Sequence, residues 1–292
     1  MHGVVLCLLS AGLLGLQIPL AKLSYNAGAD AFLFAFARSI VISGLFIALA
    51  RLQGVSLALP RRALPMVAII TAGTTAISYG YLGAIDRIPA SLAAMVFYLY
   101  PLFVLLAGAA QERRLPGPRR TGILLLAFVG LGFVFGPSLQ DLDGVGVAMG
   151  LLAALGATVY FTFVPAASAV ITSYAMLAWS NLIVAVLFLP PILIGGAGLP
   201  TGEAGWTAFL LAAAAYAAGL GLTFPAIGRT GSVKAAMLYN FEPVVIIVVS
   251  ALLLGDWLTS VQYGGVAAVL VALIFASARS AEDRPTPTPT RP

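Results

Sequence analysis

Two ionisable side chains stand well inside long apolar stretches and are the residues best able to do chemistry in a membrane. Arg38 lies in the apolar run 31–50, and Glu242 lies in the run 233–254. At about 1.5 Å per residue, Glu242 is roughly ten residues deep and so near the middle of a membrane-spanning helix. A charge there costs about 2.5–3.5 kcal/mol, so it normally faces a cavity or a partner. We predict that Arg38 and Glu242 act as charge or coupling residues, and a structural pairing of Arg38 with Glu242 or with helix-end carbonyls is the alternative.

A stripe of hydroxyls marks the run 64–83. Four of them fall on one narrow face of a helix with 3.6 residues per turn, namely Thr71, Thr74, Thr75 and Ser78. In lipid such a face should point inward, toward a cavity or a neighbouring helix. Hydroxyls that only join helices are the alternative interpretation.

Tyrosine, tryptophan and asparagine side chains recur at depths where aromatic residues are not simple interface anchors. Together with the hydroxyl stripe they predict a polar and aromatic substrate cavity lined by Thr74, Ser78, Tyr79, Tyr98, Tyr100, Tyr160, Trp179, Asn181, Tyr216, Tyr239 and Asn240. Tyr98 and Tyr100 point in nearly opposite directions on a helix, so both cannot face the cavity centre. Pro101 and Pro243 each remove a backbone donor and are predicted hinges.

The composition excludes most other kinds of protein. Apolar residues make up 61% of the 292 residues and charged residues 9%, against about 25% charged in soluble domains. The single histidine, His2, and the single cysteine, Cys7, cannot form a metal site or a disulfide within the chain. We therefore expect no cofactor, no metal and no catalytic residue, and we expect a transporter and not an enzyme. A phosphate-binding loop of the ATP-driven pumps is also missing from the sequence.

Ten apolar runs are long enough, or nearly so, to cross about 30 Å of hydrocarbon. The runs cover 3–21, 31–50, 64–83, 89–110, 120–136, 144–164, 172–194, 205–224, 233–254 and 260–278. The first run lacks the basic flank of a removable signal peptide, so we expect it to remain in the protein. The sequence therefore predicts an all-α membrane protein with ten transmembrane helices, followed by a Pro/Thr-rich tail, 280–292, that we expect to be disordered.

The basic residues indicate orientation. With a cytoplasmic amino terminus, twelve lie on the cytoplasmic side, whereas only Lys22 and Arg87 lie outside. This bias follows the positive-inside rule, so both termini should be cytoplasmic in an inner, or plasma, membrane. Because the basic residues sit in short loops, we read them as orientation signals and expect no nucleic-acid partner.

The two halves of the sequence are related. Residues 84–101 align without gaps on 226–243, at an offset of 142, with seven of eighteen positions identical, including Arg87/Arg229, Met95/Met237 and Pro101/Pro243. Five helices per unit is an odd number, so the second unit must enter the membrane inverted. We predict two inverted five-helix repeats, 1–138 and 139–279, with the substrate site between them near mid-membrane.

At this point the sequence resembles the drug/metabolite transporter superfamily, in its ten-helix EamA-type branch. The resemblance is carried by the repeated stretch beginning at residues 84 and 226, by Phe241-Glu242-Pro243 where that family commonly has Leu-Glu-Pro, and by Gly255-Asp256 where it often has Gly-Glu. Gln17 stands where the family's first helix often carries a polar residue, and we add it to the predicted substrate site.

The resemblance implies a secondary transporter that exports small amphipathic metabolites such as amino acids across the bilayer by alternating access. A drug or toxic-compound efflux carrier, or a channel or sensor of the same fold, is the alternative. Substrate identity, direction, coupling and oligomeric state are not readable from the sequence.

Overall fold

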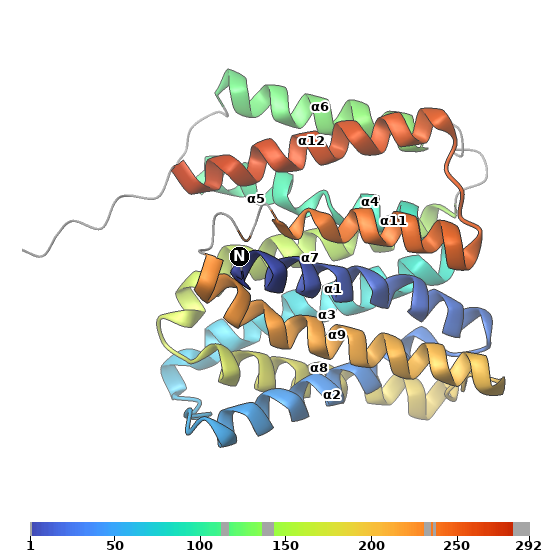
Figure 1. The fold of residues 1–292 in the computed structure, drawn as a ribbon. Coiled ribbons are helices and arrows are strands. Elements are labelled where there is room, and N and C mark those ends of the chain that lie inside the picture. Colours follow the sequence, from blue (N-terminus) through green and yellow to red (C-terminus); the bar gives the residue numbers. More distant parts are fainter. Residues whose placement is uncertain (1, 112–116, 136–142, 231–234, 236–237, 283–292) are drawn as a thin grey trace, which may run out of the picture.

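The computed structural model describes residues 2–111, 117–135, 143–230, 235 and 238–282. Its helices are α1 (His2–Asn26), α2 (Ala31–Leu52), the 3-10 turn η1 (Arg61–Ala63), α3 (Leu64–Arg87), α4 (Ala90–Phe97), α5 (Tyr100–Gln111), α6 (Pro118–Phe135), α7 (Gly144–Ser168), α8 (Ser173–Gly195), α9 (Gly202–Thr230), α11 (Phe241–Leu254) and α12 (Ser260–Glu282). Figure 1 shows them as a bundle of roughly aligned helices.

The helices match the ten predicted crossings. Within the described residues seven spans are long and apolar enough to cross a membrane, with α4 and α5 counted as one, and three shorter apolar helices cover 121–134, 241–254 and 260–275. Seven and three make ten, which supports the predicted count. The prediction of an all-α protein is confirmed.

The bundle has two ends, which we call near and far. The near end holds the start of α1, the loop 169–172 and the end of α12, whereas the far end holds the loops 27–30, 196–201 and 255–259 (Figure 1). The first residue of α4 meets the end of α11 at the far end, where the Ala90 N–H donates to Asp256 Oδ2 at 3.2 Å. Helices α4 and α11 therefore run antiparallel, as two inverted repeats require.

The fourth predicted run, 89–110, forms one crossing, Ala90–Gly108, but its helix is broken near the predicted hinge Pro101. Helix α4 ends at Phe97 and α5 begins at Tyr100. Pro101 has no N–H to bond the carbonyl four residues back, and its ring crowds that carbonyl, so the helix breaks there. Helix α11 begins at Phe241, two residues before Pro243, so both repeats start a helix at matching positions.

Close helix contacts in the bundle depend on glycine. A Cβ atom on Gly73 of α3 would lie 2.9 Å from the Gly156 carbonyl oxygen of α7, and one on Gly156 would lie 2.8 Å from the Gly73 oxygen. The two backbones therefore touch, as small residues allow in membrane helices. This contact joins the first repeat to the second.

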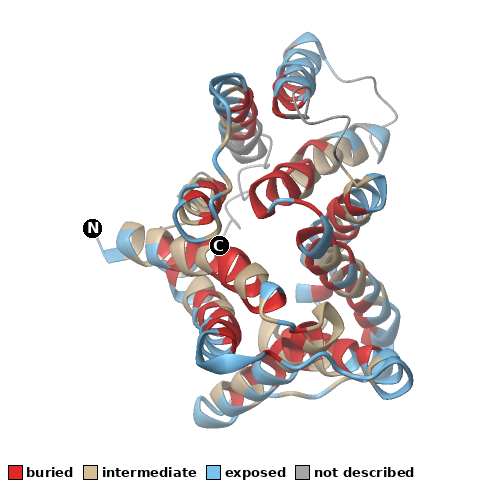
Figure 2. Cartoon of the chain, turned by 90° about the vertical axis from the view of Figure 1, so that its right-hand side faces the viewer, coloured by how far each residue is buried: buried red, intermediate tan, exposed pale blue. Residues whose placement is uncertain are grey.

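The outer faces of the bundle are apolar. Viewed along the helices, buried segments face the interior and exposed ones face outward (Figure 2). The exposed large side chains include Leu125, Phe128, Val186, Leu210 and Leu252. A soluble monomer rarely exposes so much contiguous apolar surface, whereas lipid chains cover such a surface without cost.

Some predictions fall on residues that the structure does not describe. These are residues 112–116, 136–142, 231–234, 236–237 and 283–292, which include most of the tail predicted to be disordered. Helix α12 continues to Glu282, beyond the repeat boundary predicted at residue 279.

Candidate substrate site

Arg38 joins three helices in the interior of the bundle. It lies in α2 with 4% of its surface exposed, and its Nη2 donates to the Ser78 Oγ of α3 at 3.0 Å. Its guanidinium carbon lies 4.2 Å from the centre of the Tyr216 ring of α9, a cation–π contact. Among the described residues the one ion pair within 4 Å is Arg87–Asp143, so Arg38 does not pair with Glu242.

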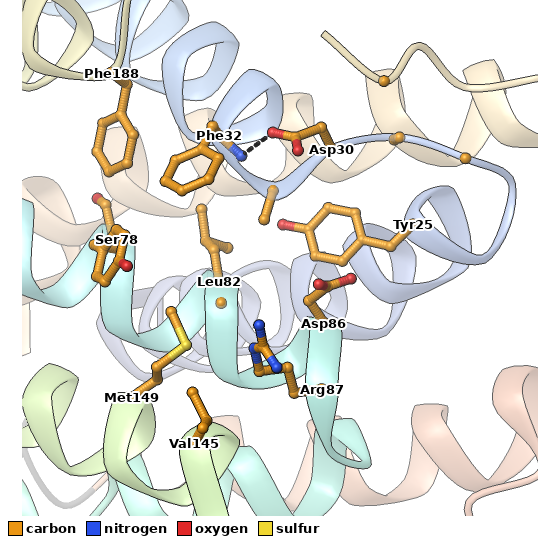
Figure 3. A pocket seen from close by; sticks show the side chains of 16 residues that line it. Tyr25, Asp30, Phe32, Ser78, Leu82, Asp86, Arg87, Val145, Met149 and Phe188 are labelled. Carbon is orange, nitrogen blue, oxygen red and sulfur yellow. Dashed lines mark hydrogen bonds between the residues drawn. The ribbon is translucent and has the colours of Figure 1, made fainter. Parts of the chain in front are cut away.

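A cavity of about 380 Å³ opens beside this contact. Side chains and backbone from both repeats line it, namely Tyr25, Gly28, Ala29, Asp30, Ala31, Phe32, Ser78, Tyr79, Leu82, Gly83, Asp86, Arg87, Val145, Met149, Phe188 and Gly198. Asp86 lies at the far end, and Ser78 lies two turns deeper in the same helix, about 12 Å away at 1.5 Å per residue. Ser78 therefore belongs to the floor of the cavity and Asp86 to its rim (Figure 3).

The cavity walls are mostly aromatic and aliphatic. Phe32 lies at 5.7 Å from Tyr79 and at 5.9 Å from Phe188, measured between ring centres. Leu82 and Met149 lie between this aromatic group and the rim (Figure 3). Such walls suit a small solute with an apolar body, since binding pockets are mainly apolar with a few polar groups that orient the ligand.

The rim residues are polar, and hydrogen bonds and an ion pair hold them in place. Asp30 caps α2, accepting hydrogen bonds from the N–H groups of Phe32 at 2.6 Å and Leu33 at 3.1 Å. Arg87 Nη1 lies 3.0 Å from Asp143 Oδ2, an ion pair between α3 and the start of α7. The hydrogen bonds from Arg87 and from the Val145 N–H hold the pKa of Asp143 below its usual range.

At the far end, Asp256 joins the repeats by its bond to Ala90. Gly255 ends α11 in the left-handed conformation at φ +72°, which a glycine adopts without strain. This turn places the Asp256 carboxylate beside Ala90, the first residue of α4. Burial raises the pKa of Asp256, and the Ala90 N–H and Lys22 oppose this effect.

Toward the near end, three hydroxyls form one network. Tyr239 donates to Ser10 Oγ at 2.6 Å, and its oxygen lies 3.1 Å from Thr223 Oγ1. Ser10 and Thr223 both donate to the Gly219 carbonyl, at 2.7 and 3.0 Å. Each hydroxyl thus donates once, and the network joins α1, α9 and Tyr239, which lies two residues before α11.

Glu242 lies in the first turn of α11 among tyrosines. It interacts electrostatically with the hydroxyls of Tyr81, Tyr98, Tyr100 and Tyr239. The buried Tyr98 hydroxyl lies beside the Glu242 carboxylate, although the two do not meet the length and angle of a standard hydrogen bond. The acid therefore stands where the broken helices α4–α5 and α11 meet α3.

The two repeats each resemble a known transporter family. The model of the EamA-like transporter family matches residues 1–136 and again residues 144–278. The chain belongs to the EamA-like transporter family. The two matches correspond to the two five-helix repeats of this EamA-like transporter.

A solved structure described only as "Crystal structure of protein" is similar to this EamA-like transporter, with a TM-score of 0.60 and 21% sequence identity over 92% of this chain and 98% of the other. At that identity the likeness shows the fold alone. The comparison with curated proteins found no match for this chain.

The structure brings several of the predicted site residues together. Ser78 and Tyr79 line the cavity. Tyr216 contacts Arg38, which in turn donates a hydrogen bond to Ser78. Tyr160 of α7 lies near Tyr216. These residues come from α3, α7 and α9, so both repeats contribute.

Other predicted residues lie elsewhere. The Trp179 indole donates to the Leu57 carbonyl near the near-end loop, and the Asn181 amide donates to Leu177 within its own helix. Thr74 likewise donates to Ile70 of its own helix, and Tyr100 stacks on Phe161 with ring centres 4.9 Å apart.

Gln17 is buried, and its Oε1 has no partner among the described residues. Asn240 caps the start of α11 without a side-chain hydrogen bond to that helix end.

Sequence reasoning missed the rim and the near-end network. Tyr25, Asp30 and Asp86 stand at helix ends, where a polar residue ordinarily signals a loop or an interface. Ser10 and Thr223 are single hydroxyls in apolar runs. Their shared feature is a polar side chain that faces inward, which becomes readable only when the neighbouring helices are known.

Proposed function

We propose that this EamA-like transporter is a secondary transporter that exports small amphipathic metabolites such as amino acids. The solute would move by alternating access, in an inner membrane with both chain termini in the cytoplasm. Under this orientation the far end faces outward and the cavity opens to the outside.

The cavity is the observation that carries the proposal. It lies between the two repeats, opens at the far end and ends at Ser78, where Arg38 and Tyr216 bridge α2, α3 and α9. On the near-end side the Tyr239 network ties α1 to α9. A site open to one side and bridged toward the other suits a carrier, because a carrier exposes its site to one side at a time.

The size and walls of the cavity support the solute class. A volume of about 380 Å³ stands at the small end of ligand pockets, which run from about 300 to 1,000 Å³. Aromatic and aliphatic walls favour an apolar body, and Ser78 with the rim acids supplies polar groups. This combination favours an amino-acid-sized solute over a large drug.

Coupling of transport to a proton is a second element of this proposal. Glu242 would carry this proton. It lies inside the bundle where α4, α5 and α11 meet, and it has no basic partner within 4 Å among the described residues, which supports this role. Facilitated diffusion without coupling is the alternative.

Counterflow in proteoliposomes tests the proposal. Vesicles loaded with unlabelled L-leucine or L-phenylalanine are diluted into the labelled amino acid. We expect transient accumulation that saturates with concentration. Uptake that rises linearly without counterflow would indicate a channel, and counterflow with cationic dyes but with neither amino acid would indicate a drug carrier.

A further inference from the structure

Arg38 is a buried cation whose neighbours do not neutralise it. Its hydrogen-bond partner, Ser78, is neutral, and its aromatic partner, Tyr216, supplies only a cation–π contact. Among the described residues no carboxylate lies within 4 Å of it, and its Nε has no hydrogen-bond partner. A buried charge without a counter-charge is costly, so its retention calls for a compensating role.

Arg38 stands directly behind the cavity floor. Ser78 both lines the cavity and accepts from Arg38, so a ligand atom that reaches Ser78 lies one hydrogen bond from the guanidinium. Arg38 also interacts electrostatically with the Tyr25 hydroxyl, which lines the same cavity. The positive charge therefore acts on the cavity although Arg38 is not part of its wall.

We infer that the cavity floor is an anion site, in which Arg38 together with Ser78 binds the carboxylate of the transported solute. This inference rests on the proposed function and specifies how its solute is bound. Ser78 Oγ accepts from Arg38, so the Ser78 hydroxyl can donate its own proton to the carboxylate, and the guanidinium charge behind it strengthens that hydrogen bond. The carboxylate supplies the missing counter-charge, and the apolar body of the solute then lies along Phe32, Leu82 and Phe188.

Asp86 at the rim does not bind the ammonium of an α-amino acid whose carboxylate lies on the floor. Asp86 lies about 12 Å from Ser78 along the helix, whereas the ammonium and carboxylate of an α-amino acid are attached to one carbon. A solute seated on the floor therefore leaves its ammonium short of Asp86. The carboxylate is thus the group that decides binding at the floor.

Three probes with one common body test the inference. They are L-phenylalanine, 3-phenylpropionate, which has the carboxylate without the ammonium, and L-phenylalanine amide, which has the ammonium without the carboxylate. Thermal unfolding of the purified full-length protein is measured against the concentration of each probe. We expect the two carboxylates to raise the melting temperature saturably and the amide to do so only at about 10- to 100-fold higher concentration, the loss expected for a hydrogen-bonded charge.

Substitutions at Arg38 test whether this residue causes the melting-temperature response to the carboxylates. Arg38→Met should abolish the response to both carboxylates without lowering the melting temperature of the protein alone, because an uncompensated buried charge is removed. Arg38→Lys should keep a weakened response, since it keeps the charge but loses the planar guanidinium that contacts both Ser78 and Tyr216. Arg51→Met, which removes an exposed cation from the end of the same helix, is the matched control and should respond as the unaltered protein does.

Several results would overturn the anion site. They are an equal response to the amide and the carboxylates, no response of the unaltered protein to either carboxylate, or an unchanged response in Arg38→Met. If Arg38→Met does not fold, two measurements still test the anion site. One is the comparison of the amide with the carboxylates, and the other is Ser78→Ala, which should weaken the melting-temperature response to the carboxylates alone. The proposed function fails separately, when proteoliposomes show no counterflow of leucine or phenylalanine although the carboxylates bind.

Discussion

The Tyr239 hydroxyl donates a 2.6 Å hydrogen bond to the Ser10 hydroxyl, across the boundary between the two repeats. Ser10 stands in the first helix and Tyr239 two residues before α11, and Thr223 of α9 completes the contact. The cavity described above opens at the other end of the bundle. Under the proposed alternating access, opening at the near end separates Tyr239 from Ser10 and Thr223 and breaks these hydrogen bonds.

Tyr239→Phe removes the hydroxyl and keeps the ring. Loss of the Ser10 bond weakens near-end closure by about 1 kcal/mol, so states open at the near end should become roughly fivefold more populated. The buried Cys7, one turn before Ser10, reports this opening. We expect a maleimide that crosses membranes to label Cys7 several-fold faster in the variant. Tyr263→Phe, at an exposed tyrosine of α12, should leave the rate unchanged, and equal rates in all three proteins would contradict a closing role for Tyr239.

Glu242→Gln keeps the size and hydrogen bonding of the side chain but cannot titrate. If Glu242 carries the coupling proton, an imposed pH gradient should no longer drive accumulation, while exchange of solute continues. The measurement is amino-acid accumulation in proteoliposomes with and without the gradient. Glu203→Gln, at an exposed acid in the first turn of α9, is the control. Gradient-driven accumulation that survives Glu242→Gln would assign coupling elsewhere or favour facilitated diffusion.

Gly73→Ala places a methyl group 2.9 Å from the Gly156 carbonyl oxygen. Because that neighbour is backbone, α3 and α7 must move apart, at a cost of about 1–3 kcal/mol. Gly132→Ala in α6 meets nothing within 4 Å and should gain up to about 1 kcal/mol from its better helix propensity. Thermal unfolding in detergent should therefore move in opposite directions for the two variants. A Gly73→Ala protein as stable as the original would show that the α3–α7 contact is looser.

The orientation is tested with single cysteines in a Cys7→Ser background. Ala197→Cys lies at the far end and Ser168→Cys at the near end, and both positions are exposed. A maleimide that cannot cross membranes should label Ala197→Cys in intact cells, and Ser168→Cys only after permeabilisation. The reverse pattern would place both termini outside and would turn the open cavity toward the cytoplasm.

Local sequence features were sufficient for the membrane class, the helix count and the repeat. Helices in lipid satisfy their own backbone hydrogen bonds, so an apolar run of sufficient length already determines a crossing. The match of residues 84–101 with 226–243 and the odd number of helices then required inverted repeats. The break in the fourth helix was also within reach, because Pro101 acts on the carbonyl four residues before it.

The contents of the site depended on how the helices pack. Of the tyrosines predicted for one cavity, Tyr79 lines it, Tyr216 faces Arg38, Tyr239 bonds Ser10 and Tyr98 lies beside Glu242. The sequence alone determined that these polar groups must avoid lipid, because burying them in hydrocarbon is costly. Only the tertiary structure decided which partner each one found, because the rotation of each helix is set by contacts such as Gly73 on Gly156, between residues far apart in the chain.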